Sequence, residues 1–361
     1  MAVTRLAITH LRNLNSLDIR LDKGVNLITG PNGSGKTSIL ESIYLLGRAR
    51  SFVSNKHTSL VQRGEKFCTV YGEIQTNNDG LVVPVGVTRA IDGKQQIKIS
   101  GDQVFSSAEL AQLLPLQVIN PGAFRLLEGG PKNRRQFVDW GVFHVEHSFM
   151  GNWKRLSRCL QQRNGILRQG MFDDQLLRSW DKEFVESSLL LAAQRQRYIE
   201  RLEPVFQDIL ARVSELEDIS FGFYPGWDEG LGLEAVLADS LVRDKKEGFT
   251  HYGPQRADLK VKHLGLTAFE TLSRGQQKLV VSCLKIAQGH LFAESNGRPC
   301  VYLVDDLAAE LDVRHRQSLS MLLSELNCQL IVTSVEESDF AQCWSEKSIR
   351  LFHVEQGKII E

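Results

Sequence analysis

Apolar and polar residues alternate along residues 3–22, as they do in strands with one buried face. The next stretch, "GVNLITG", is a short apolar run that ends on glycine. After Lys36 the apolar positions change to helical spacing, with Ile39 and Ile43 on one face, and Gly47 is expected to stop that helix. The pattern therefore predicts a strand, a glycine-rich loop and a helix in direct succession.

Later segments predict two further kinds of structure. From Cys68 to Ile99 the chain has the pattern of strands separated by the turns "NNDG" and "IDGK", which predicts an antiparallel sheet. Residues 122–247 are mostly helical in pattern and hold no strict heptad, which favours a compact arm over a long coiled coil. The runs "PCVYLVDD" and "CQLIVTS" are typical of buried parallel strands. We therefore expect an α/β domain built from residues 1–121 and 248–361, with a helical domain, residues 122–247, inserted in it.

Composition narrows the class of protein but identifies no partner. With 361 residues, 42% of them hydrophobic and 24% charged, the chain has room for two ordinary globular domains. Lys plus Arg equals Asp plus Glu at 43 each, and only residues 132–201 are mildly basic. No segment approaches the roughly 18 apolar residues of a membrane span, so no membrane association is expected. The six scattered cysteines, without a CxxC pair, are typical of a reducing compartment and predict a cytoplasmic protein.

The stretch "GPNGSGKT" fits the phosphate-binding pattern G-x-x-x-x-G-K-[ST]. Glycines allow such a loop to turn its backbone N–H groups inward, and the helix that follows adds partial positive charge. Lys36 is expected to reach the β- and γ-phosphates, and the Thr37 hydroxyl to hold Mg²⁺. An accidental glycine-rich turn is the alternative, but the predicted strand and helix on either side favour a nucleotide site. The expected site residues are Gly30, Pro31, Asn32, Gly33, Ser34, Gly35, Lys36 and Thr37.

The apolar run "VYLVDD" ends in two acids that complete this chemistry. Asp305 is expected to hold Mg²⁺ through water, and Asp306 to accept a proton from the attacking water or to orient it. Two solvated acids after a buried strand are common on their own, but the upstream loop makes that interpretation less favoured. With Lys36, these two residues are the candidate catalytic groups.

The stretch "TLSRGQQK" indicates which class of phosphate-binding protein this is. Ser273 and Gly275 open a helix with an apolar face, and a helix N-terminus is an anion site. The stretch resembles the LSGGQ signature of the ATP-binding-cassette class. That resemblance implies ATP and Mg²⁺ as cofactors, and an ATP-sandwiched dimer in which the signature closes over the partner's nucleotide. The signature residues would be Ser273, Arg274, Gly275 and Gln276, and "AELD", ending at Asp312, would be a turn at the dimer interface.

The sequence also departs from the cassette pattern. Arg274 replaces the first signature glycine, and Asp306 replaces the usual catalytic glutamate. Ser334 stands where cassette ATPases often carry a histidine that contacts the γ-phosphate. Because Asp reaches one methylene less far than Glu, we expect slow hydrolysis and a long-lived ATP state.

Three long motifs make the resemblance narrower: "PGAFRLLEGGPKNRRQFVDW", "HYGPQRADL" and "LVDDLAAELD", with "RNL" near the start and "GKI" near the end. In this order they resemble the bacterial RecF family over essentially the whole chain. The resemblance implies an α/β fold, an ATPase head of the cassette and structural-maintenance-of-chromosomes type with an inserted, mostly helical arm. One departure is Gly122, which stands where the family usually has an acid.

The same resemblance implies a function. Family members are slow, DNA-stimulated ATPases of recombinational repair, replication and the SOS response. They bind double-stranded DNA, gapped DNA and single-strand/double-strand junctions as ATP-dependent homodimers, and they help RecO and RecR to load RecA. Arg134 and Arg135 lie in a family motif and are candidates either for DNA contact or for pairing with acids of the head.

Other candidates have weaker support. Arg50 is a candidate to assist at the phosphates, and Gln117 or Asn120 to place water or metal where cassette proteins use a glutamine. His144 and His147 lie one helical turn apart, but without a third ligand a packing or surface role is favoured over metal binding.

Two alternatives belong to other classes. The ATPase subunit of a membrane transporter would have a shorter helical subdomain and a histidine at Ser334, and it leaves "GPKNRRQFVDW" unexplained. A nuclease with the same kind of head would need a metal-binding nuclease domain after it, and only about fifty residues follow Asp312.

Overall fold

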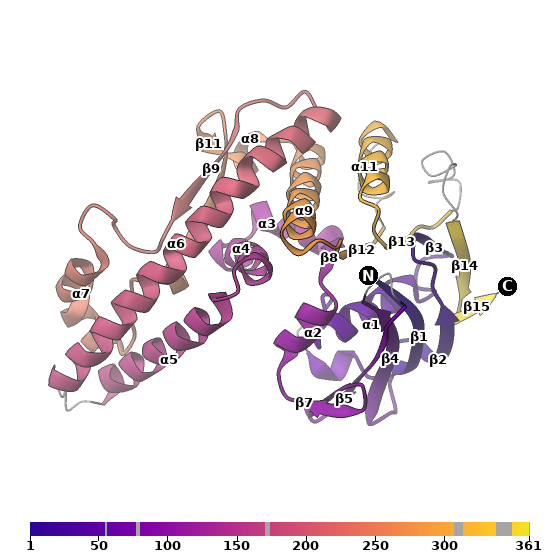
Figure 1. Ribbon diagram of the computed structural model, residues 1–361, viewed down its shortest axis with the longest axis horizontal. Helices are drawn as coiled ribbons and strands as arrows, with labels where there is room; N and C mark the ends of the chain where they lie inside the picture. The colour runs from indigo at the N-terminus through magenta and orange to yellow at the C-terminus, as the bar shows by residue number, and fades with distance from the viewer. Residues whose placement is uncertain (55, 77–79, 170–173, 307–312, 337–348, 361) are drawn as a thin grey trace. The chain divides into compact units, whose positions relative to one another are not determined.

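The computed structural model describes residues 1–54, 56–76, 80–169, 174–306, 313–336 and 349–360. These residues form two compact units (Figure 1). The first comprises Met1–Phe124, Arg212–Ser214 and Arg274–Glu361, and the second comprises Arg125–Ala211 and Glu215–Ser273. The second unit extends past the expected residue 247 because strands from residues 258–267 pair with a strand at residues 219–224 inside it. The division into an ATPase head and an arm stays a prediction at this point.

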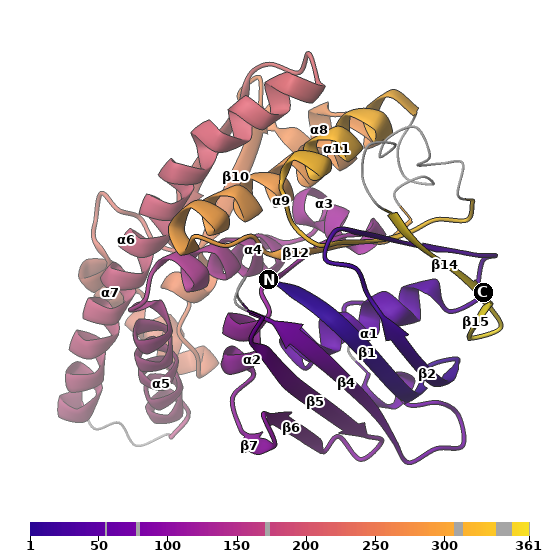
Figure 2. The same ribbon diagram turned by 45° about the vertical axis from the view of Figure 1, so that its right-hand side comes forward.

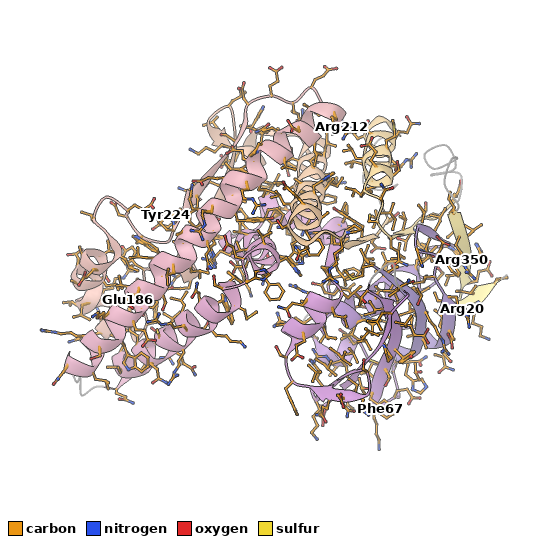
Figure 3. The ribbon with its side chains drawn as sticks, viewed as in Figure 1. Arg20, Phe67, Glu186, Arg212, Tyr224 and Arg350 are labelled. Carbon is orange, nitrogen blue, oxygen red and sulfur yellow. The ribbon has the colours of Figure 1, made fainter. Side chains whose placement is uncertain are left out.

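One sheet of the first unit is antiparallel, as the alternating pattern predicts. Its strands stand in the order β2-β1-β4-β5-β6-β7. Buried and less buried residues alternate along β4 and β5, because one face of the sheet lies against the core. The bounds are β1 (Ala2–Leu11), β2 (Leu14–Arg20), β4 (Phe67–Gln75), β5 (Val82–Ala90), β6 (Gln95–Ile99) and β7 (Asp102–Val104). Figure 3 labels Arg20 and Phe67 on this sheet.

The second sheet of this unit is mostly parallel, in the order β15-β14-β3-β13-β12-β8. Every residue of β3, β12 and β13 is buried, which explains why these strands are continuous apolar runs in the sequence. Strand β15 pairs with β14 in the antiparallel direction, and neither strand was predicted. The bounds are β3 (Val25–Thr29), β8 (Leu116–Ile119), β12 (Val301–Val304), β13 (Leu330–Thr333), β14 (Ile349–Glu355) and β15 (Lys358–Ile360).

Helix α1 (Lys36–Arg48) contributes to a core shared with both sheets. One apolar cluster contains Leu6 of β1, Val70 of β4, Ile43 of α1 and Leu303 of β12. Figure 2 shows α1 behind β1 and β4. The remaining helices of the unit are α2 (Ser107–Leu113), α9 (Arg274–Asn296) and α11 (Val313–Glu325), with short 3-10 turns at His57–Ser59 and Pro121–Phe124.

The expected helix stop at Gly47 is wrong. Helix α1 continues to Arg48, and Ala49 is its C-cap in the left-handed conformation, with φ of 49°. A Cβ at Gly47 would lie 2.6 Å from Leu116 Cδ1 and 2.8 Å from the Leu114 carbonyl oxygen. The glycine is therefore required by close packing of the helix on the chain that enters β8, and not by a turn.

Helices dominate the second unit, together with a small sheet that the sequence analysis missed. The helices are α3 (Arg125–Glu128), α4 (Pro131–Val145), α5 (Phe149–Arg168), α6 (Asp174–Val213), α7 (Leu233–Glu247) and α8 (Ala268–Thr271). Arg155 of α5 pairs with Glu183 and Glu186 of α6, and Glu186 is labelled in Figure 3. The sheet has the order β11-β10-β9, with β9 (Ile219–Tyr224), β10 (Asp258–His263) and β11 (Leu266–Thr267).

Side chains of α6 bond to the backbone of β9. The Phe221 N–H donates to Glu203 Oε1 at 2.8 Å, and Gln207 Nε2 donates to the Ile219 carbonyl. Backbone groups at the edge of a sheet are a template for pairing with another chain. Glu203 and Gln207, one helical turn apart, therefore occupy the backbone N–H and carbonyl with which an added strand would pair at these positions.

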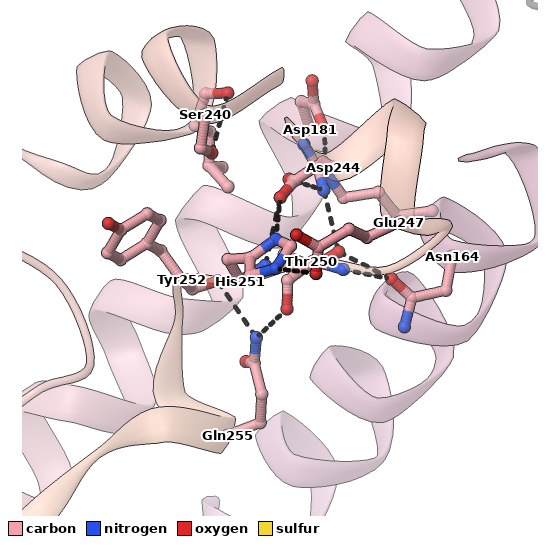
Figure 4. A network of polar contacts seen from close by, with 11 residues as sticks. Asn164, Asp181, Ser240, Asp244, Glu247, Thr250, His251, Tyr252 and Gln255 are labelled. Atoms are coloured by element: carbon pink, nitrogen blue, oxygen red, sulfur yellow. Dashed lines mark hydrogen bonds and ion pairs between the residues drawn. The ribbon is translucent and has the colours of Figure 1, made fainter. Parts of the chain in front are cut away.

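A buried charge network joins three helices of the second unit (Figure 4). The Arg163 guanidinium of α5 donates to Asp181 of α6 and to Asp244 of α7, both at 2.7 Å. His251, in the "HYGPQRADL" motif, has its ring Nδ1 2.7 Å from Asp244 Oδ1 and its Nε2 2.8 Å from Glu247. The side chains of Arg163 and Asp244 are fully buried, so each relies on protein partners in place of water.

We expect Asp244→Ala to lower the free energy of unfolding of the second unit by about 3 to 5 kcal/mol, because it leaves the Arg163 cation buried with fewer partners. Asp239→Ala, at an exposed position of the same helix, should change it by less than about 0.5 kcal/mol. Urea unfolding followed by tryptophan fluorescence measures both, since every tryptophan except Trp344 lies in this unit. Equal effects of the two variants would contradict a stabilising role for the network.

Candidate functional site

The glycine-rich loop follows β3 and enters α1 at its first residue, as predicted. Gly30, Gly33 and Gly35 have φ of 141°, 79° and 120°, which side-chain-bearing residues rarely adopt. An added Cβ at Gly30 would clash with the carbonyl oxygen of Val354 on β14, whereas one at Gly33 would meet open space. The requirement for glycine at position 30 is therefore close backbone approach as well as conformation.

Two hairpin turns brace this loop from outside. Asn13, between β1 and β2, donates from Nδ2 to the Gly33 carbonyl at 3.1 Å and accepts from the Ser38 hydroxyl at 2.9 Å. The Gly357 N–H, between β14 and β15, donates to the Ser34 carbonyl at 2.8 Å. Both turns fall in short motifs, "RNL" and "GKI", whose contacts with the loop sequence reasoning missed.

Lys36 is the first residue of α1, and its side chain turns back onto the phosphate loop. Its ammonium donates to the carbonyls of Gly30, at 2.6 Å, and Pro31, at 3.0 Å. Burial lowers the pKa of this ammonium below the ordinary lysine value, and the nearby carboxylates Asp306 and Asp305 oppose that shift. Carbonyls of the phosphate loop therefore hold the ammonium, and its contact with phosphate stays a prediction.

Thr37 and Asp305, predicted as a pair, are in contact. The Thr37 hydroxyl lies 3.0 Å and 3.2 Å from the two carboxylate oxygens of Asp305, which directly follows β12. Burial raises the pKa of the Asp305 carboxyl above its ordinary value, and hydrogen bonds from Thr333 and Thr37 oppose this. A hydroxyl beside a carboxylate supplies the hard oxygen ligands that Mg²⁺ prefers, so these residues fit a magnesium site.

Asp306 lies beside this pair in an unusual backbone conformation. Its φ is 53°, in the left-handed region, and its N–H donates to Thr333 Oγ1 at 3.0 Å. Its Oδ1 is buried without a hydrogen-bond partner among the described residues. Such an oxygen is an available acceptor for the proton of a water molecule. Thr333 itself was missed, although it lies in the run "CQLIVTS".

A cleft of about 540 Å³ unites these groups. Its lining includes Lys36, Thr37, Asp305, Asp306 and Thr333. Pockets of this size are typical of small-molecule and cofactor sites. The structure therefore brings the predicted phosphate loop and the predicted acidic pair together in one cleft of the first unit.

The signature residues stand at a helix N-terminus, as the pattern predicted. Ser273 is exposed directly before α9, Arg274 is the exposed first residue of that helix, and Gly275 and Gln276 are half-buried in its first turn. Their role across a dimer stays a prediction. Asp312 lies outside the described residues.

Arg134 and Arg135 are engaged inside the second unit. Arg134 makes a two-bond ion pair with Asp258, at 2.7 and 3.1 Å, and its side chain is only 15% exposed. Arg135 donates to the carbonyl of Ala257 at 2.7 Å. These bonds join "PKNRRQFVDW" to "HYGPQRADL". Contact of either arginine with DNA stays a prediction that this geometry does not favour.

The candidates with weaker support, Arg50, Gln117, Asn120 and His144, do not line the cleft. Gln117 is buried and donates to Gln288 of α9 at 2.9 Å. The side chain of Asn120 accepts from the Ala123 N–H, and Arg50 is exposed. His144 packs against the Trp140 ring at 4.4 Å, and no cluster of three potential metal ligands occurs in the described ranges.

The chain is similar to known proteins over nearly its whole length. The family model described as "RecF/RecN/SMC N terminal domain" matches residues 2–360. A Pseudomonas putida protein named "DNA replication and repair protein RecF" is 47% identical over 362 residues, covering 100% of this chain and 98% of its own length. The chain belongs to the RecF family. A family member of the same name from Pseudomonas aeruginosa is 47% identical over 360 residues, covering 99% of this chain and 97% of that protein.

Solved structures agree on the fold. The structure described as "the recombination mediator protein RecF-ATP in RecFOR pathway" superposes with a TM-score of 0.87 at 24% identity, covering 99% of this chain and 96% of that one. The "SmcHead bound to the C-winged helix domain of ScpA" gives 0.59 at 15% identity, covering 100% and 97%. The predicted fold class, a head of the RecF and SMC type, is confirmed.

The membrane-transporter alternative has no support from these relatives. Among the helices that the structure describes, none combines the length and apolar character of a membrane span.

We expect Asn13→Ala to weaken ATP binding about 3- to 10-fold, since it removes hydrogen bonds that hold the loop, each worth about 0.5 to 1.5 kcal/mol. Asn15→Ala, an exposed asparagine two residues along the chain, is the matched control and should bind like the wild type. Titration with a fluorescent ATP analogue measures both constants. Identical affinities for the two variants would show that the hairpin does not brace the loop.

Proposed function

We propose that this chain is an ATP-driven DNA-binding switch of recombinational repair and replication, with slow, DNA-stimulated ATPase activity. The observation that supports the ATP site best is the contact between Thr37 of the phosphate loop and Asp305 of the acidic pair. The name shared by its relatives, "DNA replication and repair protein RecF", supports the DNA part.

In this proposal ATP binds along the loop from Gly30 to Thr37. Backbone N–H groups of the loop and the N-terminus of α1 would receive the phosphates, and Lys36 would exchange its carbonyl partners for phosphate oxygens. Thr37 and Asp305 hold Mg²⁺. When bound, Mg²⁺ neutralises negative charge that develops on the phosphate oxygens.

Hydrolysis is assigned to Asp306. Its unpartnered buried oxygen accepts a proton from the attacking water or orders that water for in-line attack. The side chain is one methylene shorter than glutamate and starts from a left-handed backbone, so its reach is limited. We infer a slow reaction that acts as a timer for the bound state.

Dimer closure is assigned to the signature. Ser273, Arg274, Gly275 and Gln276 of one copy would close over the nucleotide of a second copy, with Asp312 at the interface. The helix N-terminus that carries them suits an anion. ATP binding would thus close a homodimer that binds duplex, gapped or junction DNA, and hydrolysis would reopen it. Because the chain has no net charge, DNA affinity should come from a local patch and fall with salt.

The last part of the proposal is that this protein acts in the cytoplasm together with RecO, RecR and RecA. It rests on family membership and on a solved relative whose description places it in the RecFOR pathway. The proposed task is to help RecO and RecR load RecA at gaps.

We expect the protein to bind a gapped duplex as a dimer in the presence of ATP. With ADP, or without nucleotide, we expect no DNA-bound dimer. Lys36→Met should abolish the complex, because the loop loses its phosphate-binding cation, whereas Lys98→Met, an exposed lysine on β6, should not. Light scattering combined with DNA binding measures mass and occupancy together. Dimerisation with ATP but no DNA binding at low salt would overturn the proposed repair function and leave the proposed ATPase standing. Cutting of the DNA in Mg²⁺ or Mn²⁺ would favour the nuclease alternative.

We expect Asp306→Asn to lower the rate of ATP hydrolysis about 100-fold or more while ATP still binds, because the amide cannot accept the proton. Asp102→Asn, on the exposed strand β7, controls for the loss of one carboxylate. Single-turnover hydrolysis with and without DNA measures the rate. If the Asp306→Asn variant hydrolyses ATP at the wild-type rate, another residue must activate or orient the attacking water.

A further inference from the structure

Strand β13 separates the two halves of the proposed site. The sheet order places β13 between β3, which leads into the phosphate loop, and β12, which leads into Asp305 and Asp306. Thr333 is the last residue of β13 and is fully buried. Thr333 therefore lines the same cleft as the phosphate loop and the acidic pair.

The Thr333 hydroxyl bonds to both acids at once. It lies 2.8 Å from Asp305 Oδ1 and 3.0 Å from the Asp306 backbone nitrogen. The N–H of Asp306 requires an acceptor, so a lone pair of Thr333 faces it. The single hydroxyl proton is then directed to the Asp305 carboxylate. Valine has nearly the same shape and can make neither bond.

Each bond fixes a feature that the proposed reaction needs. The bond to Asp305 holds the carboxylate beside Thr37, which also approaches the same Oδ1 at 3.0 Å. The bond from the Asp306 N–H stabilises a left-handed backbone conformation, with φ of 53°, that residues with a side chain seldom adopt. That conformation decides where the Asp306 side chain points.

We propose that Thr333 is a positioning residue that sets the metal-holding Asp305 and the water-directing Asp306 relative to each other. This inference rests on the proposed function of the same cleft. Thr333 acts through the two acids and has no assigned contact with nucleotide. A displacement of about 1 Å in such a group costs on the order of 100-fold in rate, so a residue without assigned substrate contact can have a large effect.

The test compares Thr333→Val with Thr333→Ser, which keeps the hydroxyl. Thr333→Val should lower kcat for ATP hydrolysis 10- to 100-fold and weaken binding of the fluorescent ATP analogue in the presence of Mg²⁺. Its affinity for the analogue in EDTA should stay within 2-fold of the wild type. Thr333→Ser should restore kcat to within 3-fold. Thr88→Val, which removes a half-buried hydroxyl on β5, is the matched control and should resemble the wild type.

The outcomes separate this inference from the proposed function. Wild-type kcat and Mg²⁺ dependence in Thr333→Val would overturn the inference alone. Equal losses in Thr333→Ser and Thr333→Val, with a matching fall in EDTA affinity, would show a packing role and overturn it too. If the wild type hydrolyses no ATP with or without DNA, the proposed ATPase fails. In that case the Mg²⁺-dependent difference in affinity between Thr333→Val and the wild type still decides the inference.

Discussion

The contact between the Thr37 hydroxyl and the Asp305 carboxylate joins residues 268 positions apart, and the arrangement of the site depends on it. It exists because three parallel strands, β3, β13 and β12, end at the same edge of one sheet. Parallel strands need crossover connections, and here these include α1 and, between β8 and β12, the whole second unit. The sheet therefore tolerates a large insertion, provided that β12 returns to its place beside β13.

The phosphate loop has little freedom in this arrangement. β14 lies against Gly30, the turn at Asn13 holds the Gly33 carbonyl, and the turn at Gly357 holds the Ser34 carbonyl. These contacts engage the outer side of the loop, and a bond from the Ser34 N–H to the Pro31 carbonyl, at 3.2 Å, closes the turn within it. Pre-organisation of this kind lowers the entropy that binding must overcome.

Sequence reasoning predicted the parts that depend on local pattern. The loop follows from spacing, and β3, β12 and β13 follow from apolar runs, since each is wholly buried. It missed β9 to β11 and the last hairpin, because β9 and β14 are partly exposed and lack a continuous run of buried residues. Thr333 and Asn13 were missed because their importance comes from partners far away in the chain. The interpretation of Gly47 failed for the same reason, since its neighbour Leu116 cannot be read from the local sequence.

The order of strands in the parallel sheet also bears on how the protein is made. A ribosome releases β3 and the phosphate loop early, but β12 and β13 only about 270 to 300 residues later. Contacts so distant in sequence form slowly, whereas the neighbouring hairpins of the antiparallel sheet are local. An incomplete chain that ends before β13 carries the loop, yet it lacks the strand that separates and aligns the two halves of the cleft. The loop is therefore synthesised long before the cleft around it, whose lining is complete only after Asp305, Asp306 and Thr333 have been added.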